Sequence, residues 1–281
     1  MDNLRVYAYA KLNLTLRMVG RRADGYHELQ SLVTAVDFAD RITLTPAEQG
    51  IALVAPADLG PPERNLALRA ARALLLGEQP GVRIELEKGI PAGAGLGGGS
   101  SDAAAVLVGL NELFSLGKSL GELQGIGAGL GADVPFFLGP SPAWIEGIGE
   151  KITPVDVALP AAFLVLVPRF RCPTPEVYRA FDGLHLPLSP PWLGGSARED
   201  MTFTNDLWPA AVHLYPELRR VRDLLSNVAR GVVAMTGSGS ALFAPFPSRV
   251  EAEDAADRLR SRFTGEIFVA SPSAWGYRIQ R

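Results

Sequence analysis

The chain has 281 residues, of which 47% are hydrophobic and 20% charged, and its formal net charge at pH 7 is −3. This length suits one large or two modest domains with a buried core, and the slightly acidic balance excludes a basic field that would attract nucleic acid or an anionic membrane. No apolar run approaches the ~18 residues of a membrane span, and the single cysteine, Cys172, cannot form an internal disulfide, so we expect a cytoplasmic protein.

The first predicted strand covers residues 5–17, where apolar and polar residues alternate almost without interruption. Its apolar face carries Val6, Ala8, Ala10, Leu12, Leu14 and Leu16. The opposite face carries Lys11 and Asn13, which a strand places ~7 Å apart. A lysine on a strand is most often solvated, so this face either meets solvent or lines a site.

A turn signal, Asp24-Gly25, follows this strand, and Tyr26 and His27 come directly after it. They place an aromatic ring and an imidazole beside Arg21 and Arg22.

Two further elements precede the next motif. Residues 42–45 and 51–54 predict a short strand pair. Asn65 has the side chain of an N-cap and predicts a helix over residues 66–76, closed by Gly77.

The segment between a predicted strand at residues 82–88 and a predicted helix at 102–116 is rich in glycine. It reads Pro91-Ala92-Gly93-Ala94-Gly95-Leu96-Gly97-Gly98-Gly99-Ser100-Ser101-Asp102. Glycines let the backbone approach an anion closely, and the first N–H groups of a helix have no partner within it. Together with the positive end of the helix dipole they form an anion site, so we predict that a nucleoside triphosphate binds here.

Three other interpretations of this loop fit less well. Gly93, Gly95 and Gly98 satisfy G-x-G-x-x-G, but a dinucleotide fold expects a second strand and an acidic residue about 20 positions on, and this chain continues as helix. A Walker loop would need a lysine and a hydroxyl where Gly99-Ser100 stands. A flexible linker seldom abuts both a strand and a helix.

Two aspartates stand at the starts of predicted helices. Asp133 lies two residues before Pro135, after a helix predicted between Ser119 and Leu130, and a capping and a catalytic carboxylate are equally compatible with that position. Asp102, directly after the double serine, has the character of a capping residue.

The C-terminal half mixes strands and helices without strict alternation, which predicts an α+β protein. A composition break near residues 153–160 suggests two domains, residues 1–155 and 156–281. Strands are predicted at 162–167, 231–235, 241–244, 266–270 and 275–279, helices at 210–228 and 249–262, and a long loop at 185–200. A second glycine turn at residues 236–240 is also compatible with a plain hairpin.

Several separated segments together resemble the GHMP kinases, the superfamily of galactokinase, homoserine kinase and mevalonate kinase. They are Ala10–Leu14 with Asp24–Leu29, the glycine loop, Pro173–Tyr178, Asn205–Leu207 and Thr236–Gly239. The resemblance covers most of the chain. It implies an N-terminal ribosomal-protein-S5-like nucleotide-binding domain and a C-terminal ferredoxin-like α/β sandwich.

Within this superfamily, the elements at residues 24–29 and 173–178 resemble a branch whose acceptor is a cytidyl diphosphate sugar alcohol. The resemblance implies transfer of the γ-phosphoryl group of ATP to the 2-hydroxyl of a methylerythritol, on the non-mevalonate route to isoprenoid precursors. Asp133 would accept the hydroxyl proton, Lys11 would keep Asp133 ionised and steady the attacking oxygen, and Asn13 would position the substrate.

The same resemblance assigns the binding residues. The nucleotide would be held by Pro91, Gly93, Gly95, Leu96, Gly97, Gly98, Gly99, Ser100 and Ser101, with Lys88 and Asn65 close to the adenosine. Tyr26 and Tyr178 would sandwich the cytosine, His27 would bond its edge, and Thr174, Gly237 and Ser238 would line the substrate phosphates and diol. Mg²⁺ is expected with ATP, and Ser100 or Ser101 could contact it, but the sequence contains no carboxylate cluster that is recognisable as its ligand set.

Two alternatives stay open at this point. Another small-alcohol kinase, of the homoserine or mevalonate type, would have no base to stack on Tyr26 and Tyr178. A non-catalytic nucleotide-binding module would have no use for both Lys11 and Asp133. The sequence leaves the oligomeric state open.

Overall fold

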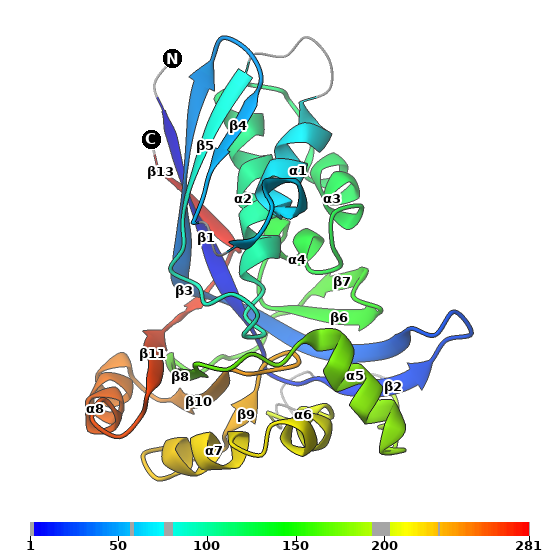
Figure 1. Ribbon diagram of the computed structural model, residues 1–281, viewed down its shortest axis with the longest axis vertical. Helices are drawn as coiled ribbons and strands as arrows, with labels where there is room; N and C mark the ends of the chain where they lie inside the picture. Colours follow the sequence, from blue (N-terminus) through cyan, green and yellow to red (C-terminus); the bar gives the residue numbers. More distant parts are fainter. Residues whose placement is uncertain (1–2, 57–58, 76–80, 193–202, 230, 281) are drawn as a thin grey trace.

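The computed structural model of the chain describes residues 3–56, 59–75, 81–192, 203–229 and 231–280. They form a nine-stranded sheet, mainly from the N-terminal half, and a four-stranded sheet from the C-terminal half (Figure 1). The strands of the larger sheet are β1 (Leu4–Asn13), β2 (Arg17–Arg21), β3 (His27–Ala47), β4 (Ile51–Val54), β5 (Gly81–Glu87), β6 (Ala143–Gly147), β7 (Lys151–Pro154), β12 (Pro272–Ser273) and β13 (Tyr277–Gln280). The central path runs β13-β1-β3-β5-β4, while β2, β6 and β12 pair with β3, and β7 pairs with β6.

Strand β3 is far longer than the strand predicted at residues 42–45, and the predicted pairing of that segment with residues 51–54 is wrong. Strand β5 lies between β3 and β4, antiparallel to β3 and parallel to β4. Parallel neighbours need a crossover connection, which here contains the helix after Asn65. Alternation of residue types indicates a strand but not which strand inserts between two others.

The register of β1 against β3 shifts between Tyr9 and Ala10, and this irregularity positions the site. Before it, Val6 and Ala8 pack into the core under the N-terminal helices. After it, Ala10, Leu12 and Leu14 pack into a different core, which also contains strands of the C-terminal sheet. The predicted single apolar face is therefore divided, as expected where a bulge turns a strand, and Leu16, beyond the end of β1, packs in a third core within the C-terminal domain.

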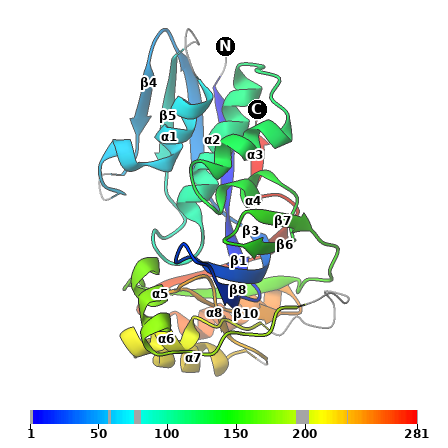
Figure 2. The same cartoon turned by 90° about the vertical axis from the view of Figure 1, so that its right-hand side faces the viewer.

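One face of the larger sheet is covered by α1 (Leu66–Leu74), α2 (Gly98–Leu113), α3 (Leu120–Ala128) and α4 (Val134–Leu138) (Figures 1 and 2). The predicted cap at Asn65 is confirmed, because its side chain accepts a hydrogen bond from the Ala67 N–H at 2.9 Å. Leu76 and Gly77, the predicted end of that helix, lie outside the described residues. A cap by Asp102 is wrong, since α2 begins at Gly98 with Gly97 as its N-cap.

The C-terminal part has the order of a ferredoxin-like domain. Its strands are β8 (Ala162–Pro168), β9 (Ala234–Met235), β10 (Leu242–Phe246) and β11 (Gly265–Ala270), and its helices are α5 (Thr174–Gly183), α6 (Trp208–Leu214), α7 (Leu218–Ser226) and α8 (Arg249–Leu259). The sheet order β11-β8-β10-β9 and the sequence strand, helices, two strands, helix, strand match this fold. Of the predicted loop at 185–200, residues 193–200 lie outside the described part of the chain.

Strand β8 joins the two domains because both its faces are buried. Leu164 and Leu166 pack with the C-terminal helices, whereas Phe163 and Val165 pack against Leu12 and other residues of the N-terminal domain. A strand buried on both sides reads as a continuous apolar run, as Ala162–Val167 does.

The chain after β11 returns to the N-terminal sheet, where β12 pairs with β3 and β13 pairs with β1. A division at residue 155 stays a prediction, and the strand pairing adds that residues 272–280 pair with the larger sheet. None of the helices in the described ranges has the length and apolar character that crossing a bilayer requires.

Candidate active site

A cleft of about 600 Å³ lies where the two domains meet, in the size range of small-molecule sites. Its lining comes from β1, the glycine loop, the start of α2, the segment before α4, α5 and the turn after β9. Of the residues predicted to act on or bind a ligand, those lining it are Lys11, Asn13, Asn65, Lys88, Pro91, Gly93, Gly95, Leu96, Gly97, Gly98, Gly99, Ser100, Asp133, Thr174, Tyr178, Gly237 and Ser238. Ser101, Tyr26 and His27 do not line it.

The glycine loop has a conformation that other residues adopt rarely. Gly93, Gly95 and Gly97 have φ angles of 71°, 79° and 73°, in the left-handed region. A Cβ at Gly95 would stand 2.3 Å from the Thr236 carbonyl oxygen, and one at Gly97 would stand 2.9 Å from the Lys11 Cγ. These glycines therefore let the loop approach both β1 and the C-terminal domain.

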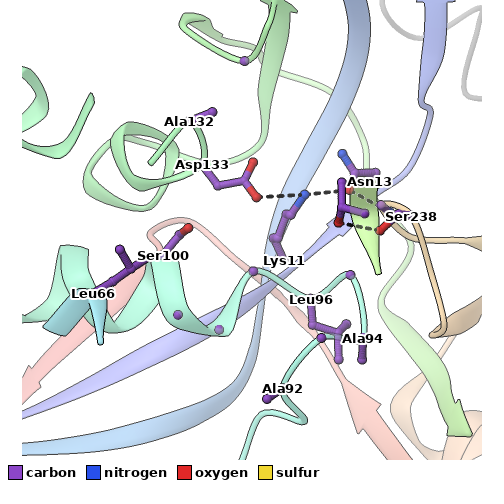
Figure 3. Close-up of a pocket in the computed structure, with 18 of the residues that line it drawn as sticks. Lys11, Asn13, Leu66, Ala92, Ala94, Leu96, Ser100, Ala132, Asp133 and Ser238 are labelled. Atoms are coloured by element: carbon purple, nitrogen blue, oxygen red, sulfur yellow. Dashed lines mark hydrogen bonds and ion pairs between the residues drawn. The ribbon is translucent and has the colours of Figure 1, made fainter. Parts of the chain in front are cut away.

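The two serines at the start of α2 have different surroundings. Ser100 lines the cleft, on the first turn of a helix of 16 residues, where backbone N–H groups are free to face an anion (Figure 3). Ser101 is fully buried and its Oγ has no hydrogen-bond partner within the described chain. Ser100 is therefore the serine that a ligand in the cleft can reach.

Lys11 and Asp133 face each other across the cleft above this helix start (Figure 3). The Lys11 Nζ lies 3.4 Å from the Asp133 Oδ2 and donates to the Asn13 Oδ1 at 2.8 Å. The Lys11 side chain is 8% exposed, whereas that of Asp133 is 41% exposed. Asp133 occupies the N-cap position of α4, yet its side chain makes no capping hydrogen bond. Its carboxylate is thus available to a ligand.

Asn13 is fixed from several sides. Its side-chain oxygen accepts hydrogen bonds from Lys11 and from the Gly237 N–H, the latter at 3.0 Å. Its amide donates to the Ser31 Oγ at 2.8 Å, and Ser31 in turn donates to the Thr15 carbonyl. An amide held in this way gives Lys11 a defined direction.

Lys88 is held by two buried carboxylates, one of which the sequence did not single out. Its Nζ donates to Asp40 and, at 2.8 Å, to the Asp102 Oδ2. Asp40 also accepts the backbone N–H groups of Gly89 and Ile90 at 2.7 and 2.8 Å. Asp40 therefore anchors the segment that enters the glycine loop, and Lys88 links it to Asp102 at the other end of the loop.

This arrangement raises the pKa values of both Asp102 and Lys88. Burial raises the pKa of Asp102 well above its usual range, against the attraction of Lys88 and with the help of the nearby Asp40. Burial alone would lower the pKa of Lys88, but the negative charges of Asp102 and Asp40 outweigh it and raise the pKa. A strand aspartate such as Asp40 gives no signal in sequence, because its partners are distant along the chain.

The residues predicted to hold a base are only partly together. The His27 ring packs 5.2 Å from that of Tyr178, and its Nε2 lies 2.8 Å from the Asp182 Oδ1. Burial and the nearby Asp133 raise the pKa of Tyr178 to about 12, so its hydroxyl stays neutral. Tyr26 is 61% exposed on the hairpin between β2 and β3.

The remaining predicted residues lie together on the C-terminal side. The hydroxyl groups of Thr174 and Ser238 are 2.8 Å apart, and Gly237 precedes Ser238 in the turn between β9 and β10. Within the described ranges, no group of three His, Cys, Asp or Glu side chains could hold a metal ion. Among these residues, at most two such side chains could therefore share a divalent cation.

Comparison with known proteins shows which family the chain belongs to. Residues 65–139 match the GHMP kinases N terminal domain, and residues 193–265 match the GHMP kinases C terminal domain. A protein of Pseudomonas fluorescens named 4-diphosphocytidyl-2-C-methyl-D-erythritol kinase is 42% identical over 269 residues, covering 94% of this chain and 92% of its own. The fold and the site thus define the chain as a GHMP kinase.

Two solved structures refine the comparison. A crystal structure of 4-(cytidine 5′-diphospho)-2C-methyl-D-erythritol kinase has a TM-score of 0.81 and 38% identity, covering 96% of this chain and 100% of that one. A homoserine kinase of Cytophaga hutchinsonii has a TM-score of 0.76 but 18% identity, covering 100% of this chain and 98% of that one, and shows the fold alone. Within the GHMP kinases, the chain belongs to the family of the 4-diphosphocytidyl-2-C-methyl-D-erythritol kinases.

Proposed function

We propose that this protein transfers the γ-phosphoryl group of ATP to the 2-hydroxyl of 4-diphosphocytidyl-2-C-methyl-D-erythritol. The observation that carries the proposal is the Lys11–Asp133 pair, 3.4 Å apart, beside the glycine loop and the start of α2 in one cleft. Phosphoryl transfer needs mainly positioning and neutralisation of charge, and this cleft offers groups for both. Family membership supports the choice of acceptor.

The exposed carboxylate of Asp133 accepts the proton of the attacking hydroxyl. One N–H of the Lys11 ammonium group donates to Asn13, and the group forms an ion pair with Asp133, so a further N–H can bond the attacking oxygen. A positioned carboxylate within reach of the hydroxyl is a common general base. The second N–H of the Asn13 amide has no protein partner in the described residues, and it donates to the acceptor.

The backbone N–H groups of residues 93–100 and the hydroxyl of Ser100 surround the triphosphate. Magnesium typically keeps several waters and binds through one or two protein oxygens plus substrate phosphates, so the absence of a carboxylate cluster among the described residues fits a Mg²⁺·ATP complex. A bound Mg²⁺ would supply neutralisation of the negative charge of the triphosphate. Ser100 is the protein ligand that we assign to it.

The cytosine of the acceptor stacks on Tyr178, with Tyr26 closing over its other face and His27 bonding its edge. Tyr178 lines the cleft and packs against His27, which supports this placement. Tyr26 exposes most of its ring, and covering it with a base would remove apolar surface from water. Thr174, Gly237 and Ser238 then line the diphosphate and the diol.

An acceptor panel tests the proposal. The purified enzyme, ATP and Mg²⁺ are mixed separately with the cytidyl substrate, homoserine and mevalonate, and ADP release is followed. We expect turnover with the cytidyl substrate only. Turnover of homoserine or mevalonate without turnover of the cytidyl substrate would refute the assignment.

A further inference from the structure

The turn between β9 and β10 contains a threonine that reaches both halves of the cleft. Thr236 is fully buried, and its Oγ1 accepts the backbone N–H of Asn13 at 3.0 Å. The same hydroxyl lies 3.3 Å from two acceptors, the Asn13 Oδ1 and the Gly95 carbonyl oxygen. Because a hydroxyl has one hydrogen, it donates to one of these at a time.

The two acceptors belong to different parts of the site. Asn13 directs Lys11, since the Asn13 Oδ1 accepts the hydrogen bond of the lysine Nζ at 2.8 Å. Gly95 is the middle of the three glycines with positive φ in the loop. Thr236 is therefore linked to the loop by one hydrogen bond and to the Lys11 ammonium group by two hydrogen bonds in series.

Neighbouring backbone bonds hold the glycine loop between the domains. The Lys11 N–H donates to the Leu96 carbonyl at 3.0 Å, from the N-terminal sheet. The Ala241 N–H donates to the Ala94 carbonyl at 3.1 Å, from the C-terminal domain. Gly95 lies between these two contacts, so a bond from Thr236 to Gly95 acts at the centre of the loop.

The turn itself has a separate support. The Asn205 amide donates to the carbonyl oxygens of Met235 and Gly237 at 2.7 and 2.8 Å, on both sides of Thr236. The position of the threonine backbone is thus set without its hydroxyl. Removing the hydroxyl therefore changes its bonds to Asn13 and Gly95 and leaves these supports of the turn.

We propose that Thr236 is a positioning residue that couples the placement of the phosphate loop to the direction of the Lys11 ammonium group, acting through Asn13. This inference rests on the proposed function, because Lys11 and the loop are its reacting halves. The Thr236 hydroxyl donates its one hydrogen either to the Asn13 Oδ1 or to the Gly95 carbonyl. A stronger hydrogen bond to one of them weakens the bond to the other, and this exchange couples the two parts of the site.

The test compares three variants in turnover and in affinity for a non-hydrolysable ATP analogue. Thr236→Val keeps the shape and removes the hydroxyl, Thr236→Ser keeps the hydroxyl, and Ser240→Ala removes a hydroxyl of the same turn that bonds only the Phe170 carbonyl, at 2.7 Å. We expect Thr236→Val to lower kcat by about 10- to 100-fold and analogue affinity by about 3- to 10-fold, the effect of one or two buried hydrogen bonds. Thr236→Ser and Ser240→Ala should stay within about threefold of the wild type in both.

Several outcomes would overturn the inference. They are a Thr236→Val enzyme with wild-type kcat, a Thr236→Ser enzyme as slow as Thr236→Val, or a Ser240→Ala enzyme as slow as Thr236→Val. Thermal melting confirms that each variant is folded, and Thr236→Ala replaces Thr236→Val if that variant does not fold. Failure of the wild type to turn over the cytidyl acceptor would instead refute the proposed function, and analogue affinity would still test the contact with the loop.

Discussion

Two buried lysines line the same cleft and differ in what surrounds them. Lys88 lies between Asp40 and Asp102, whose side chains are 0% and 4% exposed. Lys11 pairs with the carboxylate of Asp133, whose side chain is 41% exposed. A lysine between two buried carboxylates can hold a loop in place, whereas a lysine beside one accessible carboxylate can share its charge with a substrate.

The difference teaches that burial of a charged side chain does not by itself mark a catalytic centre. Both lysines are more than four-fifths buried and both make charge-assisted hydrogen bonds. Accessibility of the partner carboxylate separates them. Substitutions in the two groups of residues test this contrast, and those that affect catalysis should have larger effects than those that affect stability.

The largest expected effect is that of Asp133→Asn. The amide keeps the shape of the side chain but cannot accept the hydroxyl proton as a base, so we expect kcat to fall on the order of 10²- to 10⁴-fold. Titration calorimetry with ATP should show unchanged nucleotide binding. A variant with wild-type turnover would remove Asp133 from the mechanism.

A matched pair, Lys88→Met and Lys11→Met, should separate structure from chemistry. Lys88→Met leaves two buried carboxylates without their cation, so we expect the free energy of unfolding to fall by about 3–5 kcal/mol. Lys11→Met leaves a carboxylate that water can reach. The free energy of unfolding should therefore change by about 1 kcal/mol, while turnover is lost. Urea denaturation and turnover of both variants check the contrast, and equal losses of stability would contradict it.

Tyr26→Ala should raise the KM for the cytidyl acceptor about tenfold, because one stacked face is worth on the order of 1 kcal/mol. The KM for ATP should not change. Tyr26→Phe keeps the ring and serves as the control, with an unchanged KM for both substrates. An effect confined to ATP would show that the ring belongs to the nucleotide half.

The smallest effect concerns the pH dependence of stability. The pKa of Asp102 is raised in the folded state, so its contribution to stability is present below the unfolded pKa of about 3.9 and is lost as pH rises toward the raised value. Asp102→Asn has no such titration. We expect the free energy of unfolding of the variant, relative to that of the wild type, to increase with pH in a series of denaturation experiments. Parallel plots of this free energy against pH would contradict a raised pKa for Asp102.

The sequence predicted the parts of the site that local pattern can encode. Alternation placed Lys11 and Asn13 on one face, and their side chains are hydrogen bonded at 2.8 Å. The glycine loop between a strand and a helix was also predictable, because glycine at left-handed φ angles is a local requirement. In each case, the residues that carry the signal lie within a few positions of one another along the chain.

What the sequence could not predict depends on contacts between distant segments. Asp40 and Thr236 carry ordinary polar side chains in strand and turn, and their partners lie 48 and 223 residues away. The insertion of β5 between β3 and β4 is a property of the whole sheet, and alternation within β4 does not specify it. The catalytic interpretation of Asp133 came from the resemblance to a family. The neighbouring sequence alone was compatible with either a capping or a catalytic carboxylate.

The pairing of β13 with β1 has a consequence for synthesis on the ribosome. Residues Arg5 to Ala8, on the strand that carries Lys11, pair with Tyr277 to Gln280, so this side of β1 stays an open edge until β13 has left the exit tunnel. An emerging chain would carry its glycine loop and Lys11 before that edge is covered. The nascent chain should therefore need protection from edge-to-edge association until β13 pairs with β1.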